Sequence, residues 1–410
     1  MRPASPRSVS VATRDMQLHR PIDSRPPTRH PHRSRAALSV AGPLLLLFCC
    51  FGCSTGNARG GLIPAQPFLH HALGAPDEWY KSDDGRHFCD DLVTWQNANG
   101  GWWKKYDPRI PRPPELPPAA TDDAPPGDTE GVWRRTSTFD NDATYSEMRI
   151  LARAYRLVGT PAYRAAFERG LQFMLDAQYP SGGWPQRFPL ENNYGREITF
   201  NDNAMTNVMT MLRDVAEGRG DVSFVEPPMR EKCRAAFERG VECTLNLQIK
   251  VNGKLTAWAQ QYDDKTFQPA KARAYELPSL SADESEDIAL LLMELPHRSD
   301  RVRSAIESAA AWYDASKITG KRVATVSGPQ YENGKDRVLV DDPSAPPLWA
   351  RFYDIETNKP FFSSRDGVKR WAMSEISWER RNHYSWYGKW GQNVLDHYAD
   401  WKKRVGDEAK

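Results

Sequence analysis

The segment Gln-Asn-Ala-Asn-Gly-Gly-Trp at residues 96–102 recurs as Gln-Tyr-Pro-Ser-Gly-Gly-Trp at residues 178–184. A looser third copy begins Gln-Ile-Lys-Val-Asn-Gly at residues 248–253 and is followed by Trp258. Each copy follows a predicted helix. Gly readily ends a helix in a left-handed conformation, and Trp can cover the helix end. The copies therefore predict a chain built from repeated helical units.

A second repeat opens helices. Thr-Phe-Asp-Asn-Asp-Ala at residues 138–143 aligns without gaps with Thr-Phe-Asn-Asp-Asn-Ala at residues 199–204, and residues 281–284 resemble a capping box at another helix start. Recurring helical hairpins of this size indicate an α/α toroid, in which the inner helices share one direction. Their N-terminal ends then line one face of the ring.

Apolar residues with a helical period support this architecture. The Pro-rich stretch 107–130 must be a loop, because Pro breaks both helices and central strands. The expected fold class is all-α: an α/α toroid, or incomplete α/α barrel, with long loops and minor β-structure. Helices are predicted at residues 143–158, 161–178, 204–217, 229–248, 284–295 and 301–316.

The N-terminus has the pattern of a targeting segment. Residues 1–35 contain eight Arg and two Asp, and an uncharged run, Ala36–Cys53, follows. A basic stretch before an apolar one is typical of a signal peptide. Two alternatives stay open: a retained membrane anchor, since 18 residues are the lower limit for a span, and a lipoprotein cleaved before Cys53. We expect a signal segment at 1–53, a linker at 54–66 and one folded domain at 67–410, secreted or periplasmic.

Charge and cysteine content exclude several classes of protein. The whole chain has 55 basic and 53 acidic residues, so the chain without residues 1–53 has 47 and 51, near −4. A mildly acidic protein has no general field for nucleic acid, and a polyanion would need local cations or a metal. Cys89, Cys233 and Cys243 form no disulfide framework; one pair or three buried thiols are both open.

The Asp- and Asn-rich helix starts are the first candidate site. One interpretation is N-capping, in which each side chain binds free backbone N–H groups. However, one cap needs one side chain, and each run has three. Hard oxygen ligands that converge on one rim can instead hold Ca²⁺. The residues concerned are Asp140, Asn141, Asp142, Asn201, Asp202 and Asn203.

Arginines flanked by aromatic residues are the second candidate site. Arg273 precedes a helix start, and Arg351 lies between Trp349 and Tyr353. Guanidinium groups bind carboxylates and aromatic rings stack on sugars, a combination that suits a polymer of sugar acids. The alternatives are a surface salt bridge for Arg273 and solvent-exposed charges near helix ends for the others. The remaining candidates are Arg380, Arg381 and Tyr384.

Taken together, these stretches resemble polysaccharide lyase family 10, the pectate lyases, from about Asp91 to Trp390. The segments that carry the resemblance are 96–105, 138–144, 178–186, 198–205, 259–281, 341–353 and 379–387. The resemblance implies an α/α toroid that cleaves polygalacturonate by Ca²⁺-assisted β-elimination, and we expect a monomer.

The resemblance also implies roles for individual residues. Asp140 and Asp202 fall at metal-binding positions and Arg273 at the catalytic arginine. Asn141, Lys104, Arg351 and Tyr384 are expected to bind substrate, as is one of Arg380 and Arg381. Trp103 and Lys105 depart from the family pattern, and the loop 107–130 is long, which affects the outer subsites.

Two rival functions remain. One is a glycoside hydrolase on a similar toroid, acting on a uronate-containing polysaccharide with Asp140 and Asp202 as acid and base. The other is a non-catalytic, pectin-binding lipoprotein. The sequence has no Walker-type phosphate loop, no Gly-x-Ser-x-Gly elbow and no His-Glu-x-x-His motif.

Overall fold

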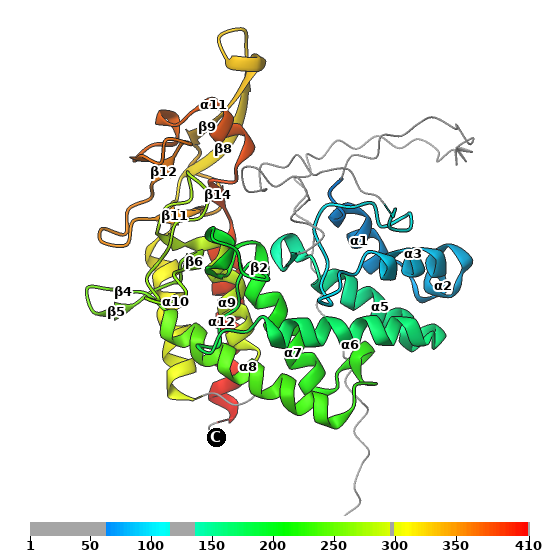
Figure 1. Ribbon diagram of the computed structural model, residues 1–410. Helices are drawn as coiled ribbons and strands as arrows, with labels where there is room; N and C mark the ends of the chain where they lie inside the picture. Colours follow the sequence, from blue (N-terminus) through cyan, green and yellow to red (C-terminus); the bar gives the residue numbers. More distant parts are fainter. Residues whose placement is uncertain (1–62, 115–135, 296–298, 409–410) are drawn as a thin grey trace, which may run out of the picture. The chain divides into compact units, whose positions relative to one another are not determined.

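The computed structural model describes residues 63–114, 136–295 and 299–408 (Figure 1). The expected signal segment, residues 1–53, and most of the expected linker lie outside the described residues, as do residues 115–130 of the Pro-rich stretch. The end of the linker is folded, because Ala65 is buried and a helix begins at Gln66. Residues 107–114 form neither helix nor strand, as expected.

The predicted helices are confirmed, with ends that shift by a few residues. α5 begins at Tyr145 rather than at residue 143, and α8 begins at Pro227, two residues before the predicted start. The helices of the described residues are α1 (Gln66–Leu73), α2 (Asp77–Lys81), α3 (Asp83–Thr94), α5 (Tyr145–Val158), α6 (Pro161–Asp176), α7 (Ala204–Glu217), α8 (Pro227–Leu247), α9 (Ala282–Met293), α10 (Asp300–Ala315), α11 (Trp378–His383) and α12 (Trp390–Glu408).

The helices pack as successive hairpins. α5 contacts α6, α7 contacts α8, and α9 contacts α10, while α7 lies between α5 and α9 and α8 contacts both α6 and α10 (Figure 1). α12 packs on α9 and α10. Two concentric layers result, with α5, α7 and α9 inside. The expected α/α toroid is therefore confirmed.

The strands are minor, as predicted, apart from one hairpin of two seven-residue strands, β8 and β9. The paired strands are β1 (Ser137–Thr138) with β2 (Arg187–Phe188), β3 (Ile198–Thr199) with β6 (Gln261–Tyr262), β4 (Lys250–Val251) with β5 (Lys254–Leu255), β7 (Leu280–Ser281) with β11 (Phe352–Tyr353), β8 (Lys321–Ser327) with β9 (Lys335–Asp341), β10 (Trp349–Ala350) with β14 (Tyr387–Gly388), and β12 (Phe362–Ser363) with β13 (Lys369–Arg370).

The repeated Trp residues all bind the preceding helix in the same way. Each indole N–H donates to a carbonyl near the end of that helix, at 3.0 Å from Trp102, 2.7 Å from Trp184 and 2.8 Å from Trp258. The looser third copy in the sequence is thus a true structural repeat. Trp349 makes the same bond at 2.8 Å to the carbonyl of Tyr313 and is a fourth copy.

The same Trp residues connect each turn to the next inner helix. The backbone carbonyl of Trp102 accepts from Thr138 at 2.9 Å, and that of Trp184 accepts from Thr199 at 3.0 Å. Thr138 and Thr199 end β1 and β3, which lead directly into the two Asx-rich helix starts. The repeat therefore fixes where each of these starts lies.

Cys89, Cys233 and Cys243 are buried and free, so of the two alternatives for these residues the structure has the three buried thiols. Within the described ranges, no helix combines the length and the apolar character that crossing a bilayer requires.

Candidate active site

The two Asx-rich segments form matching turns. Asp140–Asp142 (η1) and Asn201–Asn203 (η3) are each one turn of 3₁₀-helix with left-handed residues: φ is 54° at Asn141 and 48° at Asp202. The two turns contact each other and the start of α7. No side chain caps η1, η3, α5 or α7 at its N-terminus, so simple capping does not explain these residues.

Asp140 and Asp202 lie close enough to alter each other's ionisation. Burial acts to raise the pKa of Asp140, but the ammonium of Lys104 and the guanidinium of Arg187 hold it below its usual value. Burial and the charge of Asp140 raise the pKa of Asp202 to about 8. The predicted convergence of the two helix starts is therefore observed.

The environment of Asp140 fits a bound cation. Its Oδ2 accepts a hydrogen bond from Lys104 Nζ, whereas its Oδ1 is buried and receives no N–H or hydroxyl donor among the described residues. The carboxyl group of Asp140 also shares a hydrogen bond with that of Asp202. A buried carboxylate oxygen without a partner is costly unless a cation or donor meets it. Lys104, expected to bind substrate, is thus an ion-pair partner of Asp140 in this structure.

Arg273 is held by a buried carboxylate. Its Nε donates to Glu276 Oε2 at 2.7 Å, its backbone N–H donates to the same oxygen at 3.0 Å, and its Nη2 donates to Glu276 Oε1. Burial acts to lower the pKa of Arg273, but the carboxylate of Glu276 outweighs it and raises that pKa. Because the side chain of Glu276 is only 1% exposed, this pair is not an ordinary surface salt bridge.

A chain of hydrogen bonds joins Arg273 to Asp202. Gln260 Nε2 donates to Glu276 Oε1 at 3.3 Å and also to Asn201 Oδ1. Asn201 Nδ2 in turn donates to Asp202 Oδ2 at 2.7 Å. The arginine and the two aspartates therefore belong to one contiguous polar site.

Arg351 connects the third helix start to this site. Its Nη1 lies 2.5 Å from Asp283 Oδ2, and its Nη2 lies 2.5 Å from Glu284 Oε1, both in the first turn of α9. The guanidinium stacks on the ring of Tyr384 at 5.0 Å, and its charge acts to lower the pKa of Asp202. Two of its nitrogens are thus already bound by protein carboxylates.

The structure separates Arg380 from Arg381. Arg381 donates to both oxygens of Asp336, at 3.0 and 2.5 Å, and so fastens α11 to β9. Arg380 pairs with Glu379 and lies over the ring of Tyr275 at 4.4 Å. Because Arg273 stacks on the same ring at 5.1 Å, Arg380 is the one of the two that lies at the site.

Sequence reasoning missed Arg365. Its guanidinium lies 5.7 Å from the centre of the Tyr275 ring, so three arginines surround one tyrosine. Its side chain is 66% exposed and pairs with Glu379 at 3.1 Å. The signal was the turn Ser-Ser-Arg-Asp-Gly at residues 363–367, but nothing in the sequence places this turn against residue 275. Asn141, also a candidate, is exposed.

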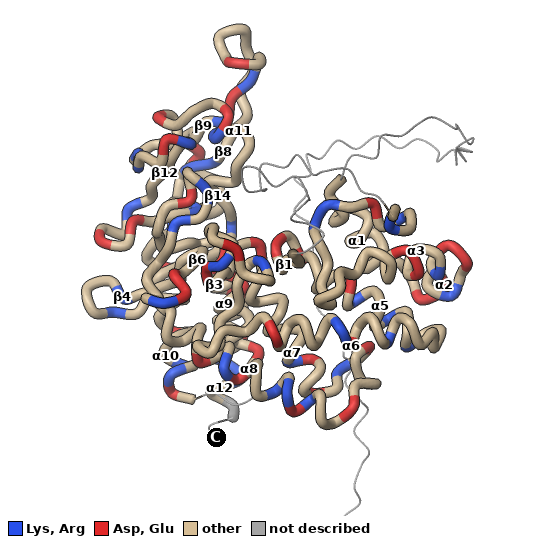
Figure 2. Tube along the Cα trace, viewed as in Figure 1, with Lys and Arg blue, Asp and Glu red and all other residues tan. Residues whose placement is uncertain are grey.

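A separate acidic cluster flanks β3 and β6. Acidic and basic residues both lie on the chain in this region (Figure 2). Among the described residues, carboxylate oxygens of Glu197, Asp263 and Asp264 all lie within 4.8 Å of one another. Carboxylates so arranged can bind a hard divalent cation. Asp264 also accepts from Arg196 Nη2 at 3.1 Å, so part of its charge is already balanced.

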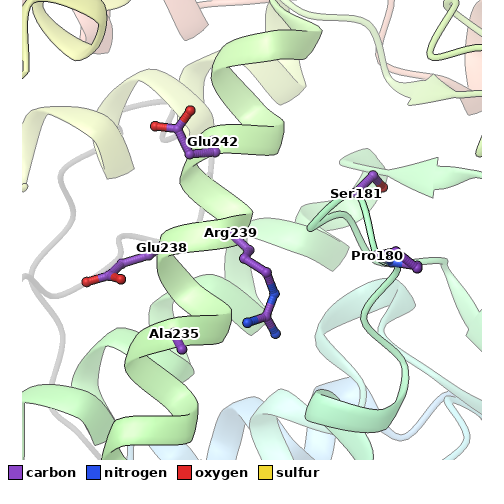
Figure 3. Close-up of a pocket in the computed structure, with 6 residues that line it drawn as sticks. All are labelled: Pro180, Ser181, Ala235, Glu238, Arg239 and Glu242. Atoms are coloured by element: carbon purple, nitrogen blue, oxygen red, sulfur yellow. The ribbon is translucent and has the colours of Figure 1, made fainter.

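A surface pocket beside α8 is unrelated to these groups (Figure 3). It is lined by Pro180, Ser181, Ala235, Glu238, Arg239 and Glu242. Its arginine donates to Gln178 Oε1 of the neighbouring turn, which is a structural contact between α8 and the repeat.

Comparisons with known proteins agree with this geometry. The family model of pectic acid lyase matches residues 96–395. A family 10 polysaccharide lyase from Cellvibrio cellulosa is 31% identical with a TM-score of 0.67, and the match covers 82% of this chain and 96% of that chain. A mutant of the family 10 enzyme from that organism, in complex with trigalacturonic acid, is 30% identical with a TM-score of 0.67 and coverages of 82% and 97%. No curated protein matches.

Proposed function

The chain belongs to the pectic acid lyase family, and from its site we propose that it cleaves α-1,4-linked polygalacturonate by Ca²⁺-assisted β-elimination. The observation that carries the proposal is the continuous network from Asp140 and Asp202 through Gln260 and Glu276 to Arg273. Such a network supports one catalytic centre rather than scattered surface charges.

The chemistry requires stabilisation of one carboxylate and removal of one proton. The C5 proton of galacturonate is weakly acidic because it lies α to a carboxylate. Bound Ca²⁺ would supply positive charge where the enolate-like intermediate develops. Asp140 and Asp202, whose buried carboxyl groups adjoin each other, are the residues that we propose to hold it.

We assign proton removal to Arg273. The C5–H bond breaks, a double bond forms between C4 and C5, and the C4–O4 bond breaks with its electron pair leaving on O4. An arginine acts as a base only if its pKa falls far below 12, which requires local positive charge and alkaline pH. Arg380 and Arg365 supply such charge around Tyr275, and they also suit the carboxylates of neighbouring sugars.

The N-terminal segment bears on where the enzyme would act. A basic stretch followed by an apolar run supports export of the chain to the periplasm or the medium, with lipid attachment at Cys53 as the alternative. Export would bring a monomeric enzyme to its polymeric substrate, which cannot enter the cell intact.

Digestion of polygalacturonate with and without EDTA tests the reaction. An unsaturated uronate absorbs at about 235 nm, and we expect this absorbance to rise only when Ca²⁺ is present. Reducing ends without that absorbance would indicate the hydrolase, and retention of oligogalacturonate without any product would indicate the non-catalytic binder. Near-full activity of Arg273→Lys at about pH 6 would contradict the assignment of the base.

A further inference from the structure

We propose that Glu276 is a positioning residue for the elimination, which fixes the guanidinium of Arg273 so that Nη1 is the nitrogen left to meet the substrate. The inference rests on the proposed function, because it concerns the same arginine. It adds a residue whose side chain binds Arg273, Gln260 and Tyr384 and that acts through Arg273.

The carboxylate of Glu276, which we call the clamp, binds one edge of the Arg273 guanidinium. Glu276 accepts from Nε at 2.7 Å and from Nη2, and its Oε2 also accepts from the backbone N–H of Arg273 at 3.0 Å. A bidentate pair between a carboxylate and an arginine fixes the guanidinium plane as well as its position. Nη1 of Arg273 has no hydrogen-bond partner among the described residues, so its two N–H groups remain available.

Glu276 is itself fixed on its other side. The hydroxyl of Tyr384 donates to Oε1 at 3.0 Å, and Gln260 Nε2 donates to the same oxygen at 3.3 Å. The backbone N–H of Glu276 donates to the carbonyl of Arg273 at 2.9 Å, which closes a tight turn. Since Gln260 also leads to Asn201 and Asp202, the orientation of Arg273 is set relative to the proposed metal ligands.

The clamp has an electrostatic cost. The charge of Glu276 raises the pKa of Arg273 and so opposes its use as a base. The rings of Tyr275 and Tyr384 face this guanidinium, and the charge of Arg380 acts on it. Arg365 lies over the same ring of Tyr275, and Arg351 lies over the same ring of Tyr384. Position and charge are therefore two separable effects of one carboxylate, and two substitutions separate them.

Glu276→Gln keeps the length of the side chain and removes its charge, whereas Glu276→Asp keeps the charge and loses the reach. We expect kcat on polygalacturonate to fall about 100-fold in both, with KM nearly unchanged, because the base is misplaced. In Glu276→Gln alone, the rising limb of the pH–kcat profile should move to lower pH by about 1 unit or more, since a neighbouring negative charge is lost.

Asp77→Asn is the matched control. Asp77 binds Arg153 through Nε at 2.9 Å and Nη2 at 2.6 Å, and it joins α2 to α5 outside the candidate site. This variant should keep the wild-type kcat and pH profile. Wild-type enzyme that forms no unsaturated product would refute the proposed function itself, which distinguishes that failure from a failure of this inference.

The inference is overturned if Glu276→Gln keeps the wild-type kcat, or if kcat falls without movement of the rising limb, since a purely structural residue would behave in that way. If Glu276→Gln does not fold, Tyr384→Phe decides, because it removes one hydrogen bond to Glu276 and leaves every charge in place. Tyr384→Phe should lower kcat several-fold and leave the rising limb of the pH–kcat profile where it is in the wild type. An unchanged kcat in this variant would also overturn the inference.

Discussion

Gly182, in the Gly-Gly-Trp turn before β3, should be among the least replaceable residues of the fold. Its φ is +93°, which an L-residue rarely adopts, and a Cβ there would lie 2.1 Å from the backbone carbonyl oxygen of Arg239. Backbone strain of this kind costs about 1–3 kcal/mol. Insertion of a methyl group into a filled space costs about 1–3 kcal/mol more. Gly182→Ala should therefore destabilise the protein by about 2–6 kcal/mol.

Gly159→Ala provides the control. Gly159 also has a positive φ, +72°, at the C-terminus of α5, but a Cβ there would meet nothing within 4 Å. Only the left-handed conformation is penalised, at about 1–2 kcal/mol. Urea denaturation followed by far-UV circular dichroism compares the two variants. If Gly182→Ala is no less stable than Gly159→Ala, the close approach of the turn to α8 does not constrain the fold as we argue.

Three further predictions concern the site and its surroundings. Burial raises the pKa of Glu147 to about 7, although the hydrogen bond from Tyr106 acts to lower it. The contribution of Glu147 to stability is therefore complete below about pH 4.5 and is lost as the pH rises through about 7. Glu147→Gln should match wild type in urea at about pH 4.5 and exceed it by about 3 kcal/mol at about pH 8; equal stability at both values would contradict the shift. Arg381→Ala should lower the urea midpoint without changing KM, whereas Arg380→Ala should raise KM. A raised KM in Arg381→Ala with an unchanged KM in Arg380→Ala would show that the two roles are exchanged. Asp202→Asn should abolish Ca²⁺-stimulated activity and Ca²⁺ binding by calorimetry while Asp264→Asn keeps both, and the opposite result would move the metal to the cluster with Glu197.

The repeats account for how far the sequence predicts the fold. Two close copies of the Gly-Gly-Trp turn and one loose copy predict the hairpins, because a helix end covered by Trp needs a fixed local pattern. The fourth copy at Trp349 has the same indole contact, but the β8–β9 hairpin separates it from its helix, α10, and no Gly-Gly pair precedes it. Insertions between a helix and its cap therefore hide a repeat from sequence comparison.

The site was predictable where one motif holds several residues and unpredictable where contacts span long stretches of chain. Matching Asx turns predict that Asp140 and Asp202 meet, since equivalent inner helices start on one face. Neighbouring residues on a helix point about 100° apart, so only the packing of α11 tells Arg380 from Arg381. Likewise, the approach of Arg365 to Tyr275 depends on a hairpin 90 residues further along the chain.

The three buried thiols of the described residues can report on local opening of the fold. Cys89 lies in α3, whereas Cys233 and Cys243 both lie in α8, and burial raises the pKa of each to about 12. Because the thiolate is the reactive form, alkylating reagents meet an inert sulfur until the surrounding helix detaches. The rate of labelling at each cysteine thus measures how often the outer layer at α8, or the N-terminal helices at α3, separates from the rest, without any engineered probe.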